Sequence, residues 1–163
     1  MGNEYRQNVG LVILNNGLIF AGFRGDVDEN SKTGWQMPQG GVDDGEKIID
    51  ACYRELFEET GITKDKIKFR ASMPYSLKYD FDKDYLKKHF GTKFERFKGQ
   101  EQFWFVFEFI GNDNDINLHA TSEKPEFSKW EWKRADFLLE NIIEFKKNVY
   151  KQLFLWMEDE KLM

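Results

Sequence analysis

Short apolar runs separated by a polar turn characterise the start of the chain. Mostly apolar residues fill positions 9–14 and 18–23, and Asn15, Asn16 and Gly17 lie between the two runs. An Asn-Gly pair between two such runs favours a two-residue turn, because Asn and Gly tolerate the positive φ angles that the turn requires. The sequence therefore predicts a β-hairpin near its beginning.

The rest of the chain alternates strand-like and helix-like patterns. Aromatic and apolar residues that recur among polar ones predict strands over 67–72, 102–110 and 127–132, with a brief extended piece at 116–118. Helical periodicity follows over 135–139 and from 142 to about 157. Strands interspersed with helices around one core predict an α+β protein, an α/β/α sandwich around a mixed β-sheet. The length of 163 residues is that of a single domain, residues 1–163.

The most informative stretch, residues 40–62, joins a glycine-rich loop to a helix. Gly61 is expected just past the end of this helix, because glycine takes a positive φ without steric cost. At the α-helical period, one face of the helix carries small apolar residues in its first turns and glutamates in its last turns. This face consists of Ile48, Ala51, Cys52, Glu55, Glu58 and Glu59.

The three glutamates are expected to repel one another. Residues spaced i, i+3 and i+4 are neighbours on a helix, and the dipole at a helix C-terminus disfavours negative charge. A hard divalent cation such as Mg²⁺ or Mn²⁺ takes carboxylate ligands and would compensate this charge. Arg54, four residues before Glu58, can supply part of the compensation. A solvated acidic helix end is the alternative interpretation of an isolated Glu-x-x-Glu-Glu pattern.

Composition and charge narrow the classes of function. The chain is 40% hydrophobic and 17% aromatic, and its formal net charge is −5. It lacks the overall basic footprint of a protein that binds duplex DNA, although a metal can supply local positive charge for nucleic-acid ends. Cys52 is the only cysteine and is expected to be a small buried residue, which fits a reducing compartment. With no signal-peptide pattern and no apolar run long enough for a membrane span, the expected location is the cytoplasm.

Residues 75–100 differ in character from the rest of the chain. They include seven Lys or Arg residues against four Asp or Glu residues, and seven Tyr or Phe residues are interleaved with them. Positive charges for phosphates and aromatic faces for stacking suit single-stranded nucleic acid. The alternative is a solvated excursion whose rings pack onto the core. The sequence leaves both interpretations open.

Residues 40–62 resemble the Nudix box at each of its fixed positions. These positions are Gly40, Glu46, Arg54-Glu55-Leu56, Glu58-Glu59 and Gly61-Ile62. Further segments are similar to the bacterial RNA pyrophosphohydrolase branch of the Nudix hydrolase family, also described as dinucleoside polyphosphate hydrolase. These segments are 5–10, 35–41, 125–127 and 130–132. The resemblance covers nearly the whole chain and implies the Nudix fold.

The resemblance also implies a metal site. Glu55, Glu58 and Glu59 match the family's ligands for a divalent cation, Mg²⁺ or Mn²⁺, and the carbonyl of Gly40 would be a further ligand. Gly40 would let the backbone approach the metal and phosphates closely. Divalent ions would clamp phosphoryl oxygens and activate a water.

Other residues of the pattern have supporting or catalytic interpretations. Glu46 is interpreted as tying the loop near the helix start, and Arg54 as orienting a ligand glutamate. Asp115 lies in a segment that resembles one where close relatives place a glutamate that reaches the metals. The general base is open among Glu58, Glu59 and Asp115, and an ordinary turn aspartate is the alternative for Asp115.

Substrate contacts follow from the same resemblance. Arg6 and Arg24 are expected on phosphates, because arginine presents a planar fork suited to phosphate oxygens. Phe145 and Lys146 match a ring and a lysine that relatives use around a nucleobase. Phe145 also fits the apolar stripe of its helix, so packing in the core is its alternative role.

The activity implied is Mg²⁺-dependent hydrolysis of a phosphoanhydride. The expected substrates are triphosphorylated RNA 5′ ends, from which pyrophosphate is removed, together with dinucleoside polyphosphates. One alternative makes dinucleoside polyphosphates the principal substrates, and the box cannot separate the two because it handles only the shared phosphates. The remote alternative is a nucleotide-binding module without catalysis, in which a box carboxylate would usually have been lost.

Overall fold

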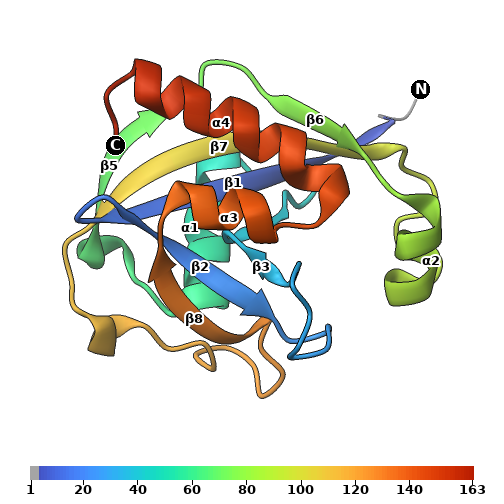
Figure 1. The fold of residues 1–163 in the computed structure, drawn as a ribbon, viewed down its shortest axis with the longest axis horizontal. Helices are drawn as coiled ribbons and strands as arrows, with labels where there is room; N and C mark the ends of the chain where they lie inside the picture. The colour runs from blue at the N-terminus through green and yellow to red at the C-terminus, as the bar shows by residue number, and fades with distance from the viewer. Residues whose placement is uncertain (1–3) are drawn as a thin grey trace.

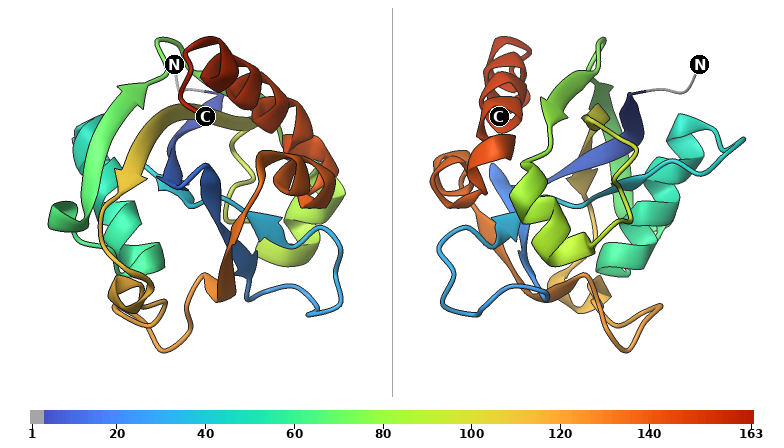
Figure 2. Two further views of the ribbon diagram at one scale, coloured as in Figure 1. Left: turned by 60° about the vertical axis from the view of Figure 1, so that its left-hand side comes forward. Right: turned by 90° about the vertical axis from the view of Figure 1, so that its right-hand side faces the viewer.

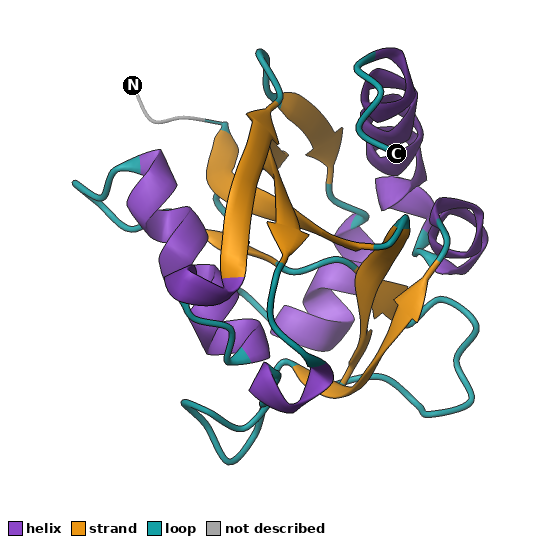
Figure 3. Ribbon diagram, turned by 90° about the vertical axis from the view of Figure 1, so that its left-hand side faces the viewer, coloured by secondary structure: helices purple, strands orange, loops and turns teal. Residues whose placement is uncertain are grey.

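A computed structural model describes residues 4–163 as one mixed β-sheet with helices on both sides (Figures 1 and 3). The strands are β1 (Tyr5–Asn15), β2 (Leu18–Arg24), β3 (Trp35–Gln36), β4 (Gln39–Gly41), β5 (Ile67–Ser72), β6 (Leu77–Asp80), β7 (Gly99–Phe109) and β8 (Phe127–Lys133). The helices are α1 (Ile48–Thr60), α2 (Lys83–Phe90), α3 (Ala135–Asn141) and α4 (Lys147–Asp159).

The sheet combines parallel and antiparallel neighbours. Its central path runs β3-β2-β1-β7-β5, and β4, β6 and β8 pair with β1, β7 and β2, respectively. Strands β1 and β7 are parallel, whereas β1 and β2 form an antiparallel hairpin. This mixed sheet between layers of helices confirms the predicted fold class.

Two hydrophobic clusters fill the space between the sheet and its helices. On one face, α3 and α4 pack against the sheet, and Trp104, Tyr150 and Leu153 are buried there. On the other face, α1 contributes Ala51, Cys52 and Leu56 to the second cluster. Figure 2 shows α1 and α4 on opposite sides of the strands. Cys52 is a buried free cysteine, as its place on the inward helix face indicates.

The β1–β2 hairpin and helix α1 form where local sequence signals predict them. Asn16 and Gly17 both have positive φ, 52° and 81°, and they connect β1 to β2 as the Asn-Gly turn predicts. Helix α1 ends at Gly61, whose φ of 74° is left-handed and whose backbone N–H donates to the carbonyl of Phe57. The hairpin precedes residues 40–62 in the chain, and Gly61 ends the helix within them.

Two expectations about secondary structure differ from the structure, and one segment contains elements that were not expected. Residues 116–118 form no strand, because the chain turns there after a short 3₁₀ helix (Asp113–Asp115). The helix expected from 142 begins only at Lys147, because Ile142 is extended and forms a β-bridge with Gly34. Residues 75–100 contain β6 and α2, neither of which the sequence pattern indicated. Every helix within residues 4–163 is too short or too polar to serve as a membrane span.

Candidate active site

Residues from strands, helices and a short turn line one cleft of about 260 Å³. Seven of the predicted site residues share this lining: Arg6, Arg24, Gly40, Glu55, Glu59, Phe145 and Lys146. They come from β1, β2, β4, α1 and the 3₁₀ turn Glu144–Lys146. The other two predicted acidic residues, Glu58 and Asp115, lie outside the lining of this cleft. The fold therefore gathers most of the predicted site in one place.

The backbone of β4 passes directly against the Glu55 carboxylate. A Cβ atom at Gly40 would lie 1.9 Å from Cδ of Glu55 and 2.1 Å from its Oε2. Strand β4 is held in this position by its antiparallel pairing with β1, in which Val9 is opposite Gly40. Any side chain at position 40 would displace the carboxylate, so glycine is required there for close approach.

Arg54 joins the loop of the box to the carboxylates of its helix. Its guanidinium donates two hydrogen bonds to Glu46, at 2.8 and 2.9 Å, and one to the carbonyl of Gly41 at 2.8 Å. It also donates to Glu55 at 2.8 Å and to Glu58 at 3.1 Å. The hydrogen bonds from Arg54 lower the pKa of Glu46 to about 2. These contacts are what the predicted positioning roles of Arg54 and Glu46 require.

Glu55 and Glu59 place buried negative charge in the cleft. Their side chains are almost fully buried, and the backbone N–H of Gln39 donates to Glu59 at 3.2 Å. Burial raises the pKa of Glu55 to about 7 against the pull of Arg54. Burial, followed by the negative charges of Glu126 and Glu55, raises the pKa of Glu59 well above its usual range. The site therefore concentrates carboxylates that its own cations compensate only in part.

Glu126 is a cleft residue that the sequence interpretation missed. It precedes β8 by one position, and its backbone oxygen accepts a hydrogen bond from Gly25 at 2.9 Å. The antiparallel register of β8 with β2, in which Phe127 is opposite Arg24, brings this end of β8 to the cleft. The available signal was an acidic residue directly before the predicted strand over 127–132.

Asp115 lies apart from the cleft. Its carboxylate accepts a hydrogen bond from the backbone N–H of Asn112 at 2.9 Å and lies 3.9 Å from Nζ of Lys66. The side chain of Asn112 in turn caps the same 3₁₀ helix, so the pair forms a capping box. The structure thus places Asp115 in a local turn rather than beside Glu55 and Glu59.

Two arginines form the basic wall of the cleft. Arg6 donates to Gln100 at 3.2 Å, and its guanidinium carbon lies 4.7 Å from the centre of the Phe94 ring. Arg24 is 7% exposed and donates to the hydroxyl of Tyr85 and to the carboxylate of Asp26. Among residues 4–163, Nε of Arg24 has no hydrogen-bond partner. Both side chains are therefore held in the cleft by groups that fix their orientation.

Phe145 and Lys146 line the cleft from the turn that precedes α4. Lys146 is buried and donates from Nζ to Oε1 of Gln36 at 3.2 Å. Burial, together with the positive charge of Arg24, lowers the pKa of Lys146 to about 7. Phe145 is half-buried and packs against the rings of Tyr79 and Tyr85. Phe145 thus contacts the core and faces the cleft, so its two expected roles are compatible.

The donor chemistry of the cleft fits a hard divalent cation. Glu55 and Glu59 supply carboxylate oxygens, and β4 approaches Glu55 so closely at Gly40 that only a glycine fits there. The ion pair with Arg54 draws the Glu58 carboxylate toward the guanidinium. Within residues 4–163, no three His, Cys, Asp or Glu side chains are already grouped closely enough to hold a metal ion.

Comparisons with known proteins agree with this arrangement. The NUDIX domain family model matches residues 4–153. An RNA pyrophosphohydrolase of Erythrobacter litoralis (strain HTCC2594) is 43% identical over 149 residues, which are 91% of this chain and 87% of that protein. The chloroplastic Nudix hydrolase 26 of Arabidopsis thaliana is 44% identical over 154 residues, 91% of this chain and 67% of that protein.

Solved structures with low sequence identity share the fold. An Ap4A hydrolase of C. elegans in a binary complex has a TM-score of 0.63 at 19% identity, over 94% of this chain and 98% of that chain. The dihydroneopterin triphosphate pyrophosphohydrolase of E. coli has a TM-score of 0.67 at 17% identity, over 91% and 95% of the two chains. The chain belongs to the Nudix family of hydrolases.

Proposed function

We propose that the chain is a divalent-metal-dependent hydrolase that removes pyrophosphate from the 5′ end of triphosphorylated RNA. The observation that carries this proposal is the shared cleft, in which the buried carboxylates of Glu55 and Glu59 face the cationic groups of Arg6, Arg24 and Lys146. Carboxylates for metal ions and cations for phosphates are the two components that phosphoryl transfer requires. The RNA pyrophosphohydrolases at about 40% identity support RNA ends as the substrate.

Glu55, Glu58, Glu59 and the carbonyl of Gly40 would hold the cation. Mg²⁺ and Mn²⁺ accept such oxygen ligands, and when bound they supply charge compensation for phosphoryl oxygens and a more acidic water. Glu58 is partly exposed and would leave its ion pair with Arg54 to take part. Arg54 would then retain Glu46 and the Gly41 carbonyl, which keep the loop against the helix.

The basic wall of the cleft, together with Lys146, would bind the polyphosphate. Arg6 and Arg24 would direct guanidinium N–H groups at phosphate oxygens, and Arg24 would exchange its contacts with Tyr85 and Asp26 to do so. Lys146 would become protonated as a phosphate approaches, because a nearby negative charge raises the pKa of an ammonium. The ring of Phe145, beside Lys146, would provide an aromatic face for the nucleobase.

Glu59 is the candidate general base that lines the cleft. Of the three candidates in the sequence, Glu58 and Asp115 lie outside the lining. Glu59 lines the cleft, where its carboxylate can reach a water beside the bound phosphates. Glu59 would accept a proton from water as the water oxygen bonds to one phosphorus of the α–β anhydride. The bridging oxygen would leave with the other phosphorus.

Product identification in ¹⁸O-labelled water tests this proposal. The wild-type protein with Mg²⁺ should convert 5′-triphosphate RNA to 5′-monophosphate RNA and pyrophosphate, and mass spectrometry of the label identifies the phosphorus attacked. Glu59→Gln should abolish this conversion, whereas Glu29→Gln, which removes an exposed carboxylate of a loop, should not. Folded wild-type protein that releases no phosphate product would support the non-catalytic binding module instead.

Dinucleoside polyphosphates are the second candidate substrates. The cationic groups of Arg6, Arg24 and Lys146 address a phosphate chain, which both substrate classes contain. Competition between a short 5′-triphosphate RNA and a diadenosine polyphosphate at equal concentration compares their kcat/KM values directly. Preferential consumption of the RNA supports the proposal, and preferential consumption of the dinucleotide makes the second candidate the principal activity.

A further inference from the structure

A row of cations and rings leads away from the mouth of the cleft. Phe90, Lys93 and Phe94, at the end of α2 and just after it, belong to the cleft lining. The guanidinium of Arg6 lies over one ring, that of Phe94, and Nζ of Lys93 lies 5.2 Å from the centre of the same ring. A polyanion held at Arg6 would therefore meet Lys93 as it leaves the cleft.

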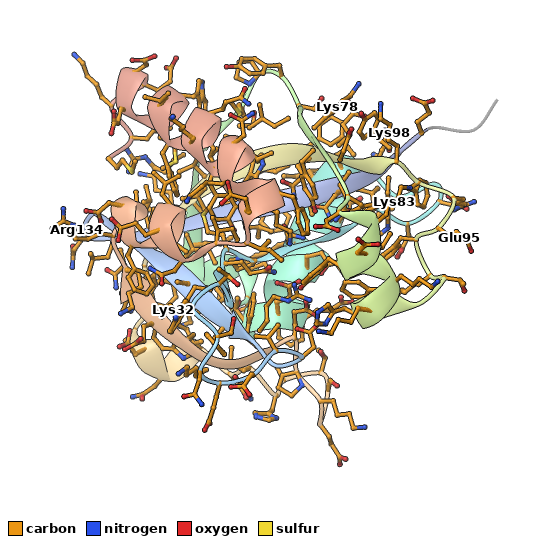
Figure 4. All side chains as sticks on the ribbon, turned by 45° about the vertical axis from the view of Figure 1, so that its right-hand side comes forward. Lys32, Lys78, Lys83, Glu95, Lys98 and Arg134 are labelled. Atoms are coloured by element: carbon orange, nitrogen blue, oxygen red, sulfur yellow. The ribbon has the colours of Figure 1, made fainter. Side chains whose placement is uncertain are left out.

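The row continues beyond Lys93 along the start of β1. The guanidinium of Arg96 lies 4.6 Å from the ring centre of Phe97, and the backbone N–H of Lys98 donates to the carbonyl of Glu4 at 2.7 Å. Nζ of Lys98 lies 5.9 Å from the ring centre of Tyr5. Figure 4 shows Lys83 and Lys98 on the same side of the molecule.

Two of the four acidic residues in residues 75–100 are engaged in local structure. The side chain of Asp82 caps α2 by accepting from the backbone N–H groups of Asp84 and Tyr85. Asp80 accepts from the hydroxyl of Tyr5 at 2.7 Å and lies 3.9 Å from Nζ of Lys98. Asp84 and Glu95, the other two acids of the segment, are exposed, and the exposed Lys and Arg side chains of α2 and the following turn outnumber the exposed acids.

Three aromatic rings of residues 75–100 pack against one another. Phe81 and Phe94 stack with centroids 6.0 Å apart, and Phe90 lies 5.4 Å from Phe94. These three rings are half-buried, whereas Lys87, Lys88 and Arg96 are exposed. The two interpretations of residues 75–100 are therefore compatible, because the rings pack inward while the cations remain accessible.

We propose that this surface binds single-stranded RNA on the 3′ side of the nucleotides held in the cleft. We call it the basic ridge, and it consists of Lys87, Lys88, Lys93, Arg96, Phe97 and Lys98. The inference rests on the proposed function, in which the 5′ end of the RNA occupies the cleft. Phosphates would contact the cations and a base would stack on the half-buried ring of Phe97, a combination that binds single strands with little dependence on sequence. Lys87, Lys88 and Arg96 lie outside the cleft lining, so a dinucleoside polyphosphate held in the cleft would use them less than a longer RNA would.

Removal of three ridge charges outside the cleft lining tests the inference. The variant is Lys87→Gln/Lys88→Gln/Arg96→Gln. Its matched control, Lys32→Gln/Arg134→Gln/Lys151→Gln, removes the same charges from exposed positions elsewhere, and Figure 4 shows Lys32 and Arg134 on the opposite side from Lys83 and Lys98. Steady-state KM is measured for a 5′-triphosphate RNA of about 12 nucleotides and for a dinucleoside tetraphosphate.

The ridge variant should raise KM for the long RNA by roughly three- to tenfold and leave KM for the dinucleotide within about twofold. Its log–log salt slope for the long RNA should be shallower by about 2, because each lost phosphate contact on a single strand contributes ~0.7. The control variant should show neither change. Equal effects on both substrates, or none on the long RNA, would overturn the inference.

Direct binding separates this inference from the proposed function. Fluorescence anisotropy with a 5′-hydroxyl RNA requires no catalysis, so it reports the ridge even if the wild-type protein hydrolyses no triphosphate. Weaker binding by the ridge variant supports the ridge, and unchanged binding contradicts it. Absence of hydrolysis by the wild-type protein contradicts the proposed function alone.

Discussion

The guanidinium of Arg54 and the carboxylate of Glu46 are joined by two hydrogen bonds, Nε to Oε2 at 2.8 Å and Nη2 to Oε1 at 2.9 Å. The same guanidinium reaches Glu55 at 2.8 Å. A planar fork therefore connects a loop residue to a carboxylate of the cleft. This connection is the basis on which we propose that Arg54 and Glu46 position the carboxylates of the helix.

Arg54→Lys should lower kcat/KM by about 10- to 100-fold, because lysine keeps the charge but cannot hold Glu46 and Glu55 together. The Mn²⁺ or Mg²⁺ concentration needed for half-maximal rate should rise in parallel. Arg70→Lys is the matched control, since Arg70 forms a single pair with Glu108 on the exposed edge of the sheet. Equal kinetics in the two variants would show that the fork geometry is irrelevant.

Gly40→Ala should destabilise the metal-free protein by about 1–3 kcal/mol, because the new Cβ would collide with the Glu55 carboxylate. In a Glu55→Ala background the same substitution should cost much less, since the colliding atoms are gone. Urea unfolding of the four proteins gives the coupling energy between the two positions. An identical cost in both backgrounds would place the constraint elsewhere.

The unfolding free energy of the metal-free protein should show the cost of burying the charged Glu59 carboxylate. The pKa of Glu59 is raised above 4.5 in the folded state, so the folded protein binds the extra proton and loses stability as the pH rises above that value. Glu59→Gln lacks this loss. In chelator, its unfolding free energy should exceed that of the wild type at neutral pH, and the difference should shrink toward pH 4.5. Glu29→Gln should show no such trend, and a Glu59→Gln variant less stable than wild type at neutral pH contradicts the prediction.

Local sequence signals predicted the parts of the site that lie close together in the chain. The turn at Asn16 and Gly17 and the helix end at Gly61 depend on backbone angles that those residues favour. Residues 40–59 are one loop and one helix, so their spacing alone indicates that the glutamates share a face. The ion pair of Arg54 with Glu58 follows from the i, i+4 helical spacing, whereas the contact of Arg54 with Glu46 was not predicted.

Contacts between distant segments could not be predicted in this way. Glu126 reaches the cleft only because β8 pairs with β2 in a particular register, which no local pattern specifies. Asp115 shows the converse, because Asn112 and Asp115 carry the spacing of a local capping box that favours a turn. The helix α2 had a signal too, in the cap residue Asp82, but its charged sequence obscured the helical period.

Lys146 should titrate near neutrality in the free protein. Burial lowers its pKa from 10.5 to about 7, so between these values the unfolded chain binds the extra proton and stability rises with pH. The contribution is at most ~1.4 kcal/mol per pH unit. Lys146→Met removes this dependence, and Lys151→Met, at an exposed position of α4, should keep it. Urea unfolding across this range, with NMR of the Lys146 ammonium, provides the measurement, and a normal pKa for Lys146 would contradict the prediction.

Anomalous diffraction from crystals soaked in Mn²⁺ tests the central claim most directly, because it locates the metal independently of any substrate. The account predicts anomalous density beside the carboxylates of Glu55 and Glu59 in the wild-type protein and its loss in Glu55→Gln/Glu59→Gln. Density only at other carboxylates, or none in the cleft at saturating Mn²⁺, would contradict it.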